Sequence, residues 1–105
     1  MAQFDVYRNA NPGSKSRVPY LLDIQSDLLD MLSTRVVVPL CKPEVLNGKL
    51  AERLNPVLEV EGRKFVLLAP ELAGVSRKVL GDCVGNPSRH RQAIIAAIDL
   101  VITGI

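Results

Sequence analysis

The chain has 105 residues, of which 48% are apolar and 23% charged, so length and composition predict one folded domain with a single core rather than a disordered chain. Its net charge is +2, from 13 basic and 11 acidic side chains, which argues against a protein that binds nucleic acid mainly through its own charge. The start lacks the basic region and apolar run of a signal peptide, and no apolar stretch reaches the roughly 20 residues of a membrane span. We therefore expect a cytoplasmic protein without membrane contact.

The first part of the chain predicts a hairpin followed by a strong strand. Phe4–Tyr7 alternates apolar and polar residues, and Tyr20–Ile24 resumes a strand-like pattern after a polar, turn-rich segment over residues 8–17. Arg35–Leu40 is a β-branched run too short for a helix. Because Pro39 cannot donate a backbone hydrogen bond, we expect it at a strand end, an edge or a bulge.

The second part predicts a tight hairpin, a weak strand and one helix. Val57–Val60 and Arg63–Leu68 flank Gly62, which can supply the positive φ of a hairpin turn. Ser76–Leu80 is a weaker strand candidate that ends at Gly81. Asn86-Pro87 is a good helix start and Gly104 a natural stop, and between them the apolar residues form one helical face: Ile94, Ile95, Ile98, Val101 and Ile102. The expected fold is mainly β, a small antiparallel barrel closed by a C-terminal helix.

Nothing in the sequence favours catalysis or a metal site. The only histidine, His90, falls on the polar face of the predicted helix and is interpreted as a solvated imidazole. The two cysteines, Cys41 and Cys83, are too few for a structural zinc site and are expected to be buried free thiols, with a disulfide or redox switch as the alternative. An acidic cluster, Asp23, Asp27 and Asp30, is expected to serve turn capping and solvation rather than glycosidase or metal chemistry. We predict no catalytic residue, no metal and no cofactor.

Four segments carry motifs in order along the chain: Q-F-D-V-Y over residues 3–7, D-I-Q-S-D-L-L-D over 23–30, R-V-V-V-P-L over 35–40, and A-I-D-L-V-I-T-G-I over 97–105. They resemble the Q-F-x-V-Y opening, the D-V-Q-S-D segment, the R-hydrophobic-hydrophobic-I-P-L strand and the final helix ending in Gly-Ile of the CcdB family. This family contains the toxins of plasmid-stabilising toxin–antitoxin modules. The matches keep their order and spacing from residue 3 to residue 105, with a small insertion in the first loop.

The resemblance implies an SH3-like antiparallel β-barrel with a C-terminal α-helix, CcdB/MazF-like, in one domain over residues 1–105 that forms a homodimer. Toxins of this family bind the A subunit of DNA gyrase and trap the enzyme on cleaved DNA, which is binding rather than catalysis. The gyrase-facing residues implied by position are Leu28, Leu29, Asp99, Ile102, Thr103, Gly104 and Ile105. The alternative for Ile102 and Ile105 is that they complete the core face of the helix.

The resemblance also implies a CcdA-like antitoxin, whose disordered tail folds onto the toxin. Such a pair binds operator DNA only as the complex, in operon autoregulation. The candidate antitoxin contacts are Arg8, Lys15, Arg17, Lys42, Pro43 and Glu44, with a solvated loop as the alternative for each.

One departure from the family keeps two other functions open. The plasmid toxin has a Phe-Trp pair before its last Gly-Ile, whereas this chain has Ile102-Thr103. A toxin fold that has lost gyrase poisoning and survives as an interaction protein is the first alternative. A MazF-like endoribonuclease is the second, although Arg35 is followed by Val36 and so does not match the Arg-Pro strand motif of that family.

Overall fold

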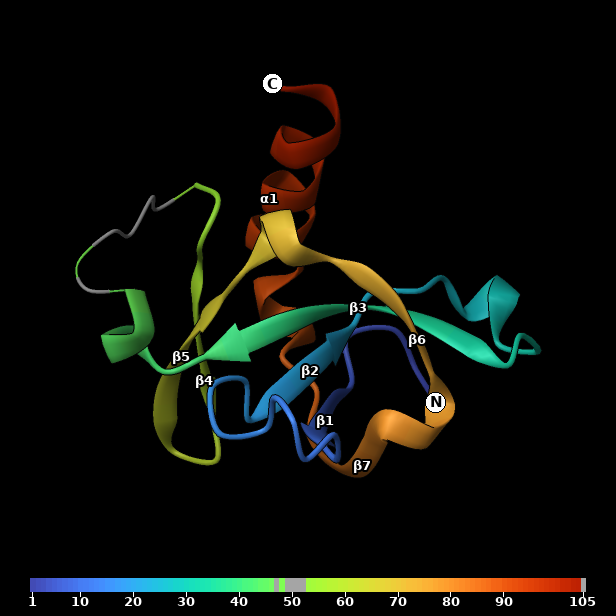
Figure 1. The fold of residues 1–105 in the computed structure, drawn as a ribbon. Coiled ribbons are helices and arrows are strands. Elements are labelled where there is room, and N and C mark those ends of the chain that lie inside the picture. The colour runs from blue at the N-terminus through green and yellow to red at the C-terminus, as the bar shows by residue number, and fades with distance from the viewer. Residues whose placement is uncertain (47, 49–52, 105) are drawn as a thin grey trace.

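A single antiparallel sheet and one long helix make up most of the computed structural model, which describes residues 1–46, 48 and 53–104 (Figure 1). The helix α1, Arg91–Thr103, follows the last strand. The strands have the spatial order β4-β5-β3-β2-β1-β7, with β6 paired to β3. Their bounds are β1 Val6–Asn9, β2 Tyr20–Asp23, β3 Thr34–Cys41, β4 Val57–Val60, β5 Arg63–Leu67, β6 Ala73–Ser76 and β7 Leu80–Gly85.

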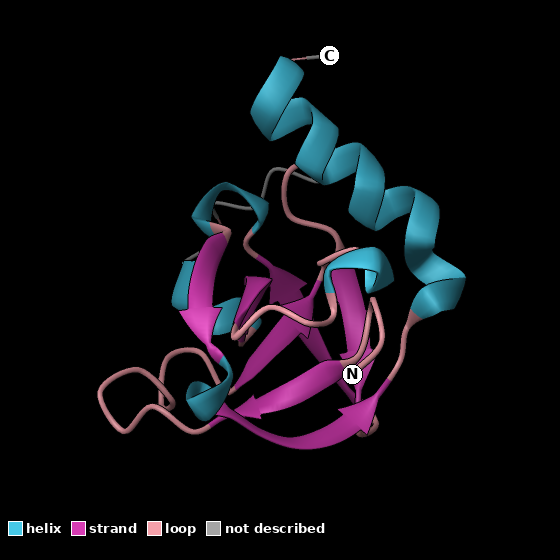
Figure 2. Cartoon of the chain, turned by 90° about the vertical axis from the view of Figure 1, so that its right-hand side faces the viewer, coloured by secondary structure: helices cyan, strands magenta, loops and turns pink. Residues whose placement is uncertain are grey.

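The main core lies between the concave face of this sheet and the first turns of α1 (Figure 2). Alternate residues of β4 are buried, so Leu58 and Val60 point inward while Val57 and Glu59 face solvent. Every strand from β1 to β5 contributes to the core, and Ile94 of α1 packs against them with no exposed surface. The helix is therefore attached to the sheet by its N-terminal half, while its other end projects away from the sheet.

The predicted fold class is confirmed: the protein is mainly β, an antiparallel sheet with one C-terminal α-helix. The sheet curls without closing completely, since β4 and β7 form the two ends of its strand order. An ion pair bridges this open seam from Arg8 on β1 to Glu61 in the β4–β5 turn, with Nη2 and Oε2 3.0 Å apart. Behind it, the hydroxyl of Tyr20 donates to Oε1 of Glu61 at 2.6 Å.

The hairpins predicted for both parts of the chain are confirmed. β1 pairs with β2, and β4 pairs with β5 around a turn in which Glu61 and Gly62 have φ of 52° and 78°. β1 begins two residues later than expected, because Phe4 adopts a φ of 72° and turns its ring into the core. The two consecutive positive φ angles match the twist of the flanking strands.

The position of Pro39 differs from the prediction. It lies inside β3, which is an interior strand, rather than at an end, an edge or a bulge. β3 pairs with β6 over residues 34–37 and with β5 at Leu40 and Cys41, so Pro39 falls between the two neighbours. A residue without an N–H is tolerated there because the ladder changes partner at that point.

The segment after residue 72 was predicted least well. Ser76–Leu80 is not a strand: β6 ends at Ser76, a 3-10 turn spans Arg77–Val79, and β7 begins at Leu80 and contains Gly81. The helix also starts later than expected. Asn86 accepts from the backbone N–H of Ser88, but Ser88–His90 forms a 3-10 turn before α1, which then ends at Gly104 as predicted.

The two thiols have different environments. Cys41 is buried, as expected, and burial raises the pKa of its thiol, whereas Cys83 is exposed on β7 and corrects the expectation of two buried thiols. Both are free, which excludes a disulfide between them in this structure. No helix in the described part of the chain is long and apolar enough to cross a membrane.

Candidate functional site

The predicted gyrase-facing residues fall in two separate regions of the molecule. Leu28 and Leu29 lie in the connection between β2 and β3, which we call the β2–β3 turn (residues 24–33) and which projects at the right of Figure 1. The other predicted residues that the structure describes, Asp99 and Ile102–Gly104, lie at the end of α1, at the top of the same view. All are exposed, with 86% exposure for Leu28 and 70% for Ile102, while Ile105 lies outside the described residues.

The end of α1 is held by its own backbone. Gly104 adopts a φ of 75°, and its N–H donates to the carbonyl of Leu100 at 3.0 Å, which closes the last turn. The hydroxyl of Thr103 donates to the carbonyl of Asp99 at 2.7 Å. The exposure of Ile102 is inconsistent with the alternative in which this residue completes the core face of the helix. Among the described residues of this end, Ile102 therefore presents a large apolar side chain to solvent.

The β2–β3 turn is built by the Gln-Ser-Asp motif. Ser26 starts a short 3-10 turn, η1 (Asp27–Leu29), by accepting from the N–H of Leu28 at 3.2 Å. The side chain of Gln25 is buried and bridges two elements, since its Nε2 donates to the carbonyl of Leu29 at 2.8 Å and its Oε1 accepts from the N–H of Val36 at 3.0 Å. The motif thus ties the turn to β3.

A buried ion pair anchors the base of this turn. Arg35 and Asp23 both have fully buried side chains, and Nε and Nη2 of Arg35 donate to Oδ2 of Asp23 at 3.0 and 2.5 Å. A third donor, Nη1 of Arg35, reaches Oδ1 of Asp30 at 3.0 Å. Burial raises the pKa of Asp23, although the hydrogen bonds from Arg35 act in the opposite direction. Asp23 does cap the start of the turn, since its Oδ1 accepts from the N–H of Gln25 at 3.0 Å, but the solvation expected for the acidic cluster is wrong for this residue, which is fully buried.

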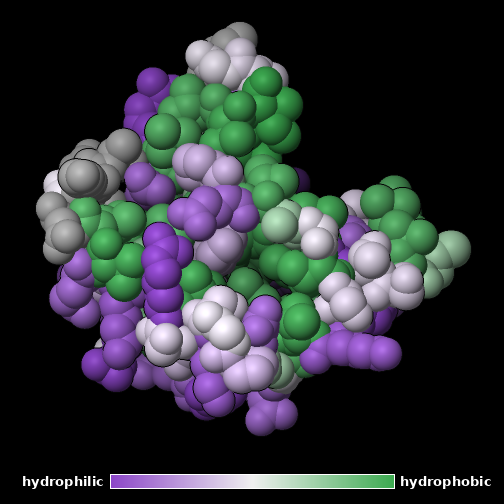
Figure 3. All heavy atoms as spheres, viewed as in Figure 1, coloured by the Kyte–Doolittle hydropathy of each residue, from purple (hydrophilic) through white to green (hydrophobic). Residues whose placement is uncertain are grey.

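The exposed apolar surface of this turn is larger than the motif indicated. Met31 is 88% exposed and Leu32 is 44% exposed, beside Leu28 and Leu29. Figure 3 shows hydrophobic surface over this projecting turn, and separately along α1. Sequence reasoning missed Met31 and Leu32 because they lie outside the family motif, although four apolar residues within a polar turn are a signal in themselves.

The candidate antitoxin contacts gather at the opposite end of the β2–β3 ladder. Tyr20 pairs with Leu40, so the loop before β2 and the 3-10 turn η2 (Pro43–Leu46) after β3 start from the same end. The six predicted residues, all exposed, are Arg8, Lys15, Arg17, Lys42, Pro43 and Glu44. Arg8 and Lys15 line one open hollow of about 380 Å³ together with Tyr20.

Carboxylates already pair with two of these basic residues. Arg8 pairs with Glu61, as described above, and Nη1 of Arg17 lies 3.7 Å from Oε1 of Glu71. These pairs are half exposed, so each contributes little and can exchange partners. Burial, together with donation to the Glu61 carboxylate, raises the pKa of Tyr20.

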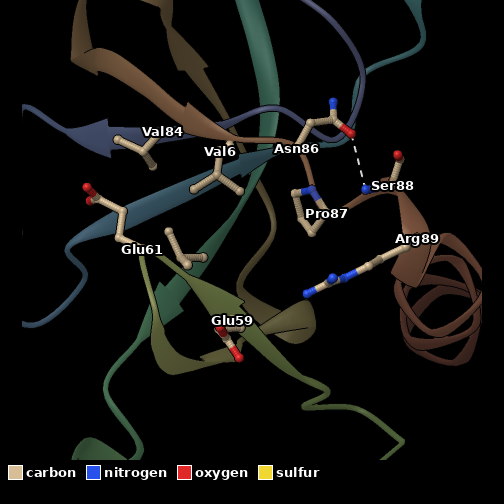
Figure 4. Close-up of a pocket in the computed structure, with 10 residues that line it drawn as sticks. Val6, Glu59, Glu61, Val84, Asn86, Pro87, Ser88 and Arg89 are labelled. Atoms are coloured by element: carbon tan, nitrogen blue, oxygen red, sulfur yellow. Dashed lines mark hydrogen bonds between the residues drawn. The ribbon is translucent and has the colours of Figure 1, made fainter.

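A further pocket of about 240 Å³ lies at the open seam of the sheet (Figure 4). Val6 and Val84 line it together with Glu59, Glu61 and Arg89. His90, the residue after Arg89, is partly buried, and its Nε2 accepts from Nε of Arg89 at 3.3 Å. In the described residues no three Cys, His, Asp or Glu side chains are arranged to hold a metal ion.

Comparison with known proteins supports the assignment that the motifs indicate. The fold resembles that of an endoribonuclease in complex with its cognate antitoxin from a mycobacterial species, with a TM-score of 0.77 and 14% identity over 97% of this chain and 94% of the other. An endoribonuclease from a mycobacterial species is similar too, with a TM-score of 0.74 and 13% identity over 97% and 90%. At such identity these likenesses describe the fold alone. The model of the CcdB family, described as CcdB protein, matches residues 3–104, and the chain belongs to this family.

Proposed function

We propose that this protein is the toxin of a toxin–antitoxin module and acts by binding the A subunit of DNA gyrase and trapping the gyrase–cleaved DNA complex. The observation that carries the proposal is the exposure of the apolar side chains that the family motif assigns to gyrase binding, Leu28 and Ile102 above all. Large apolar side chains that project into solvent on two structured elements are typical of a protein-binding surface. Trapping needs only a higher affinity for the cleaved state than for the others.

A homodimer would unite the two regions. In one protomer the β2–β3 turn and the end of α1 lie apart, so a two-fold arrangement is required for a continuous surface built from both. The exposed Ile102 near the C-terminal end of the helix would then lie beside its symmetry mate. Sedimentation at micromolar concentration, with a mass of twice 11.5 kDa expected, tests this part of the proposal.

An antitoxin of the CcdA type would bind at the other end of the β2–β3 ladder. The hollow that Arg8 and Lys15 line is open and basic, and Tyr20 also lines it. An extended acidic tail could place a carboxylate against Lys15 and compete with Glu61 for Arg8. Binding there would leave Leu28 and Ile102 uncovered, so neutralisation would need a tail long enough to reach one of them.

A MazF-like endoribonuclease remains the second candidate, because both similar folds carry that name. Arg35 is unsuited to RNA cleavage, since its guanidinium is fully buried against Asp23. Arg89 lines the seam pocket together with the carboxylates of Glu59 and Glu61, and Glu61 is paired with Arg8. Incubation with single-stranded RNA at high protein concentration tests this candidate, and cleavage that Glu61→Gln abolishes would favour it.

The deciding experiment is a gyrase cleavage assay with supercoiled plasmid, ATP and the purified protein. We expect linear DNA to accumulate with the intact chain and not with a variant that lacks Gly104 and Ile105. Val57→Ser is the matched control, because Val57 is an exposed apolar residue on β4, away from both regions. An intact chain that gives no linear DNA at tens of micromolar would overturn gyrase poisoning and favour the interaction-protein alternative. A truncated variant that poisons as well as the intact chain would remove the end of α1 from the site.

A further inference from the structure

The exposed large apolar side chains of the described residues are concentrated in one place. Seven such residues are exposed, and four of them lie within the five positions 28–32. A fifth, Met1, adjoins the same region, since its sulfur lies 3.1 Å from Nη1 of Arg77. The β2–β3 turn therefore offers more apolar surface than the two leucines of the family motif provide.

Arg77 holds this turn from a distant part of the chain. It belongs to the 3-10 turn η4 (Arg77–Val79) between β6 and β7. Its Nε donates to the carbonyl of Leu32 at 2.8 Å, and its Nη2 donates to the carbonyl of Asp30. Its backbone N–H donates to the carbonyl of Ser33 at 3.3 Å. Arg77 therefore donates to three carbonyls of the turn, two through its guanidinium and one through its backbone N–H.

Arg77 and Arg35 both lie close to the carboxylate of Asp30. Nη1 of Arg35 donates to Oδ1 of Asp30 at 3.0 Å, and Nη2 of Arg77 lies 3.7 Å from the same oxygen. Two arginines thus hold the turn, the buried Arg35 and the partly exposed Arg77. Three backbone carbonyls of the turn are therefore bonded to Arg77 while four large apolar side chains are exposed, whereas the residues of an ordinary surface turn are mostly polar or small.

We propose that Arg77 is the positioning residue of the partner-binding surface, and that Met31 and Leu32 contact the same partner as Leu28 and Leu29. The partner is an apolar protein surface, which on the proposed function belongs to the gyrase A subunit, so this inference rests on that function. A clamped turn loses little conformational entropy on binding, which favours affinity. The additional apolar area of Met31 and Leu32 also compensates for the aromatic side chain that this chain lacks at Thr103.

The first test is hydrogen exchange of the free toxin, which requires no partner. Arg77→Ala should increase exchange of the amides over residues 28–32, and Arg77→Lys should restore part of the protection, because a lysine can still donate to one carbonyl. Lys78→Ala is the matched control, since it removes an adjacent exposed cation from the same turn. Unchanged exchange in Arg77→Ala would overturn the positioning role.

The second test measures affinity for a purified gyrase A fragment. We expect Met31→Gln, Leu32→Gln and Leu28→Gln each to weaken binding about tenfold, and Val57→Gln to leave the affinity unchanged. Arg77→Ala should weaken binding by a similar factor with little change in thermal stability. If the intact toxin binds and only Leu28→Gln weakens it, Met31 and Leu32 are not part of the surface. If the intact toxin does not bind at all, the proposed function itself fails, whereas the exchange experiment still decides the role of Arg77.

Discussion

The β2–β3 turn and the C-terminal end of α1 both expose large apolar side chains, but they are supported in different ways. The turn depends on side chains from β2, β3 and η4, in particular Asp23, Arg35 and Arg77. The described hydrogen bonds at the end of α1 lie within the helix itself, from Gly104 to Leu100 and from Thr103 to Asp99. The first surface is therefore a product of tertiary structure, and the second of local sequence.

This difference predicts how substitutions in each region affect folding. A helix end that depends on local hydrogen bonds accepts substitutions because the core does not depend on it. A turn that is anchored by a buried ion pair transmits any change in that pair to the core, since Asp23 and Arg35 lie among core strands. We expect substitutions beneath the turn to alter folding, and substitutions at the helix end to alter function alone.

The largest effect should come from Arg35→Ala, which leaves the Asp23 carboxylate buried without its cation. Breaking a buried pair in this way typically costs about 3–5 kcal/mol, so the free energy of unfolding measured in urea should fall by that amount. A double variant, Asp23→Leu with Arg35→Met, removes both charges and should recover most of the loss. A single variant that loses less than about 1 kcal/mol would mean that the turn is not anchored through this pair.

A smaller effect is expected for Gln25→Ala, which takes away the bridge between the turn and β3. The carbonyl of Leu29 and the N–H of Val36 would each lose a side-chain partner, at a cost of about 1–3 kcal/mol in unfolding free energy. Gln25→Glu separates the two contacts, because it keeps the acceptor for Val36 and removes the donor for Leu29. Equal stability of Gln25→Ala and the parent protein in urea would contradict the bridging role.

Local patterns in the sequence were sufficient for the strands that contribute most to the core. β4 and β5 were predicted from the two segments that flank Gly62, and β3 from its β-branched run. The helix face was predicted from its spacing, although only its first half packs on the sheet, as the burial of Ile94 and the exposure of Ile102 show. Where a segment buries one face, its sequence carries that information.

β6 and β7 could not be predicted because most of their residues are exposed or half-exposed, which removes the alternating pattern. Gly81 was interpreted as a stop, yet it lies inside β7. A Cβ at this position would lie 3.0 Å from the carbonyl oxygen of Arg8, so a glycine allows β7 to approach β1 closely. Such a requirement comes from the neighbouring strand and leaves no local signal.

The candidate site, like the fold, was predicted only in part from the sequence. The family motif identified Leu28 and Leu29, and the structure places both at an exposed turn. The residues that hold this turn, Arg35 and Arg77, could not be recognised as a pair of clamps from their sequence positions. Their shared target, Asp30, becomes evident only when β3 and η4 are brought together by the pairing of β3 with β6.

The smallest effect is expected at the helix end, and its direction sharpens the contrast with the turn. Thr103→Ala removes a hydroxyl whose bond to the Asp99 carbonyl is exposed and local, and alanine is a better helix former than threonine. The free energy of unfolding in urea should therefore stay within about 0.5 kcal/mol of the parent value or rise slightly, whereas Gln25→Ala lowers it. Because Thr103 is exposed in the surface proposed for gyrase, the same variant can still change the yield of linear DNA in the cleavage assay. A loss of stability comparable to that of Gln25→Ala would mean that the end of α1 also depends on tertiary contacts, and the distinction between the two regions would then be wrong.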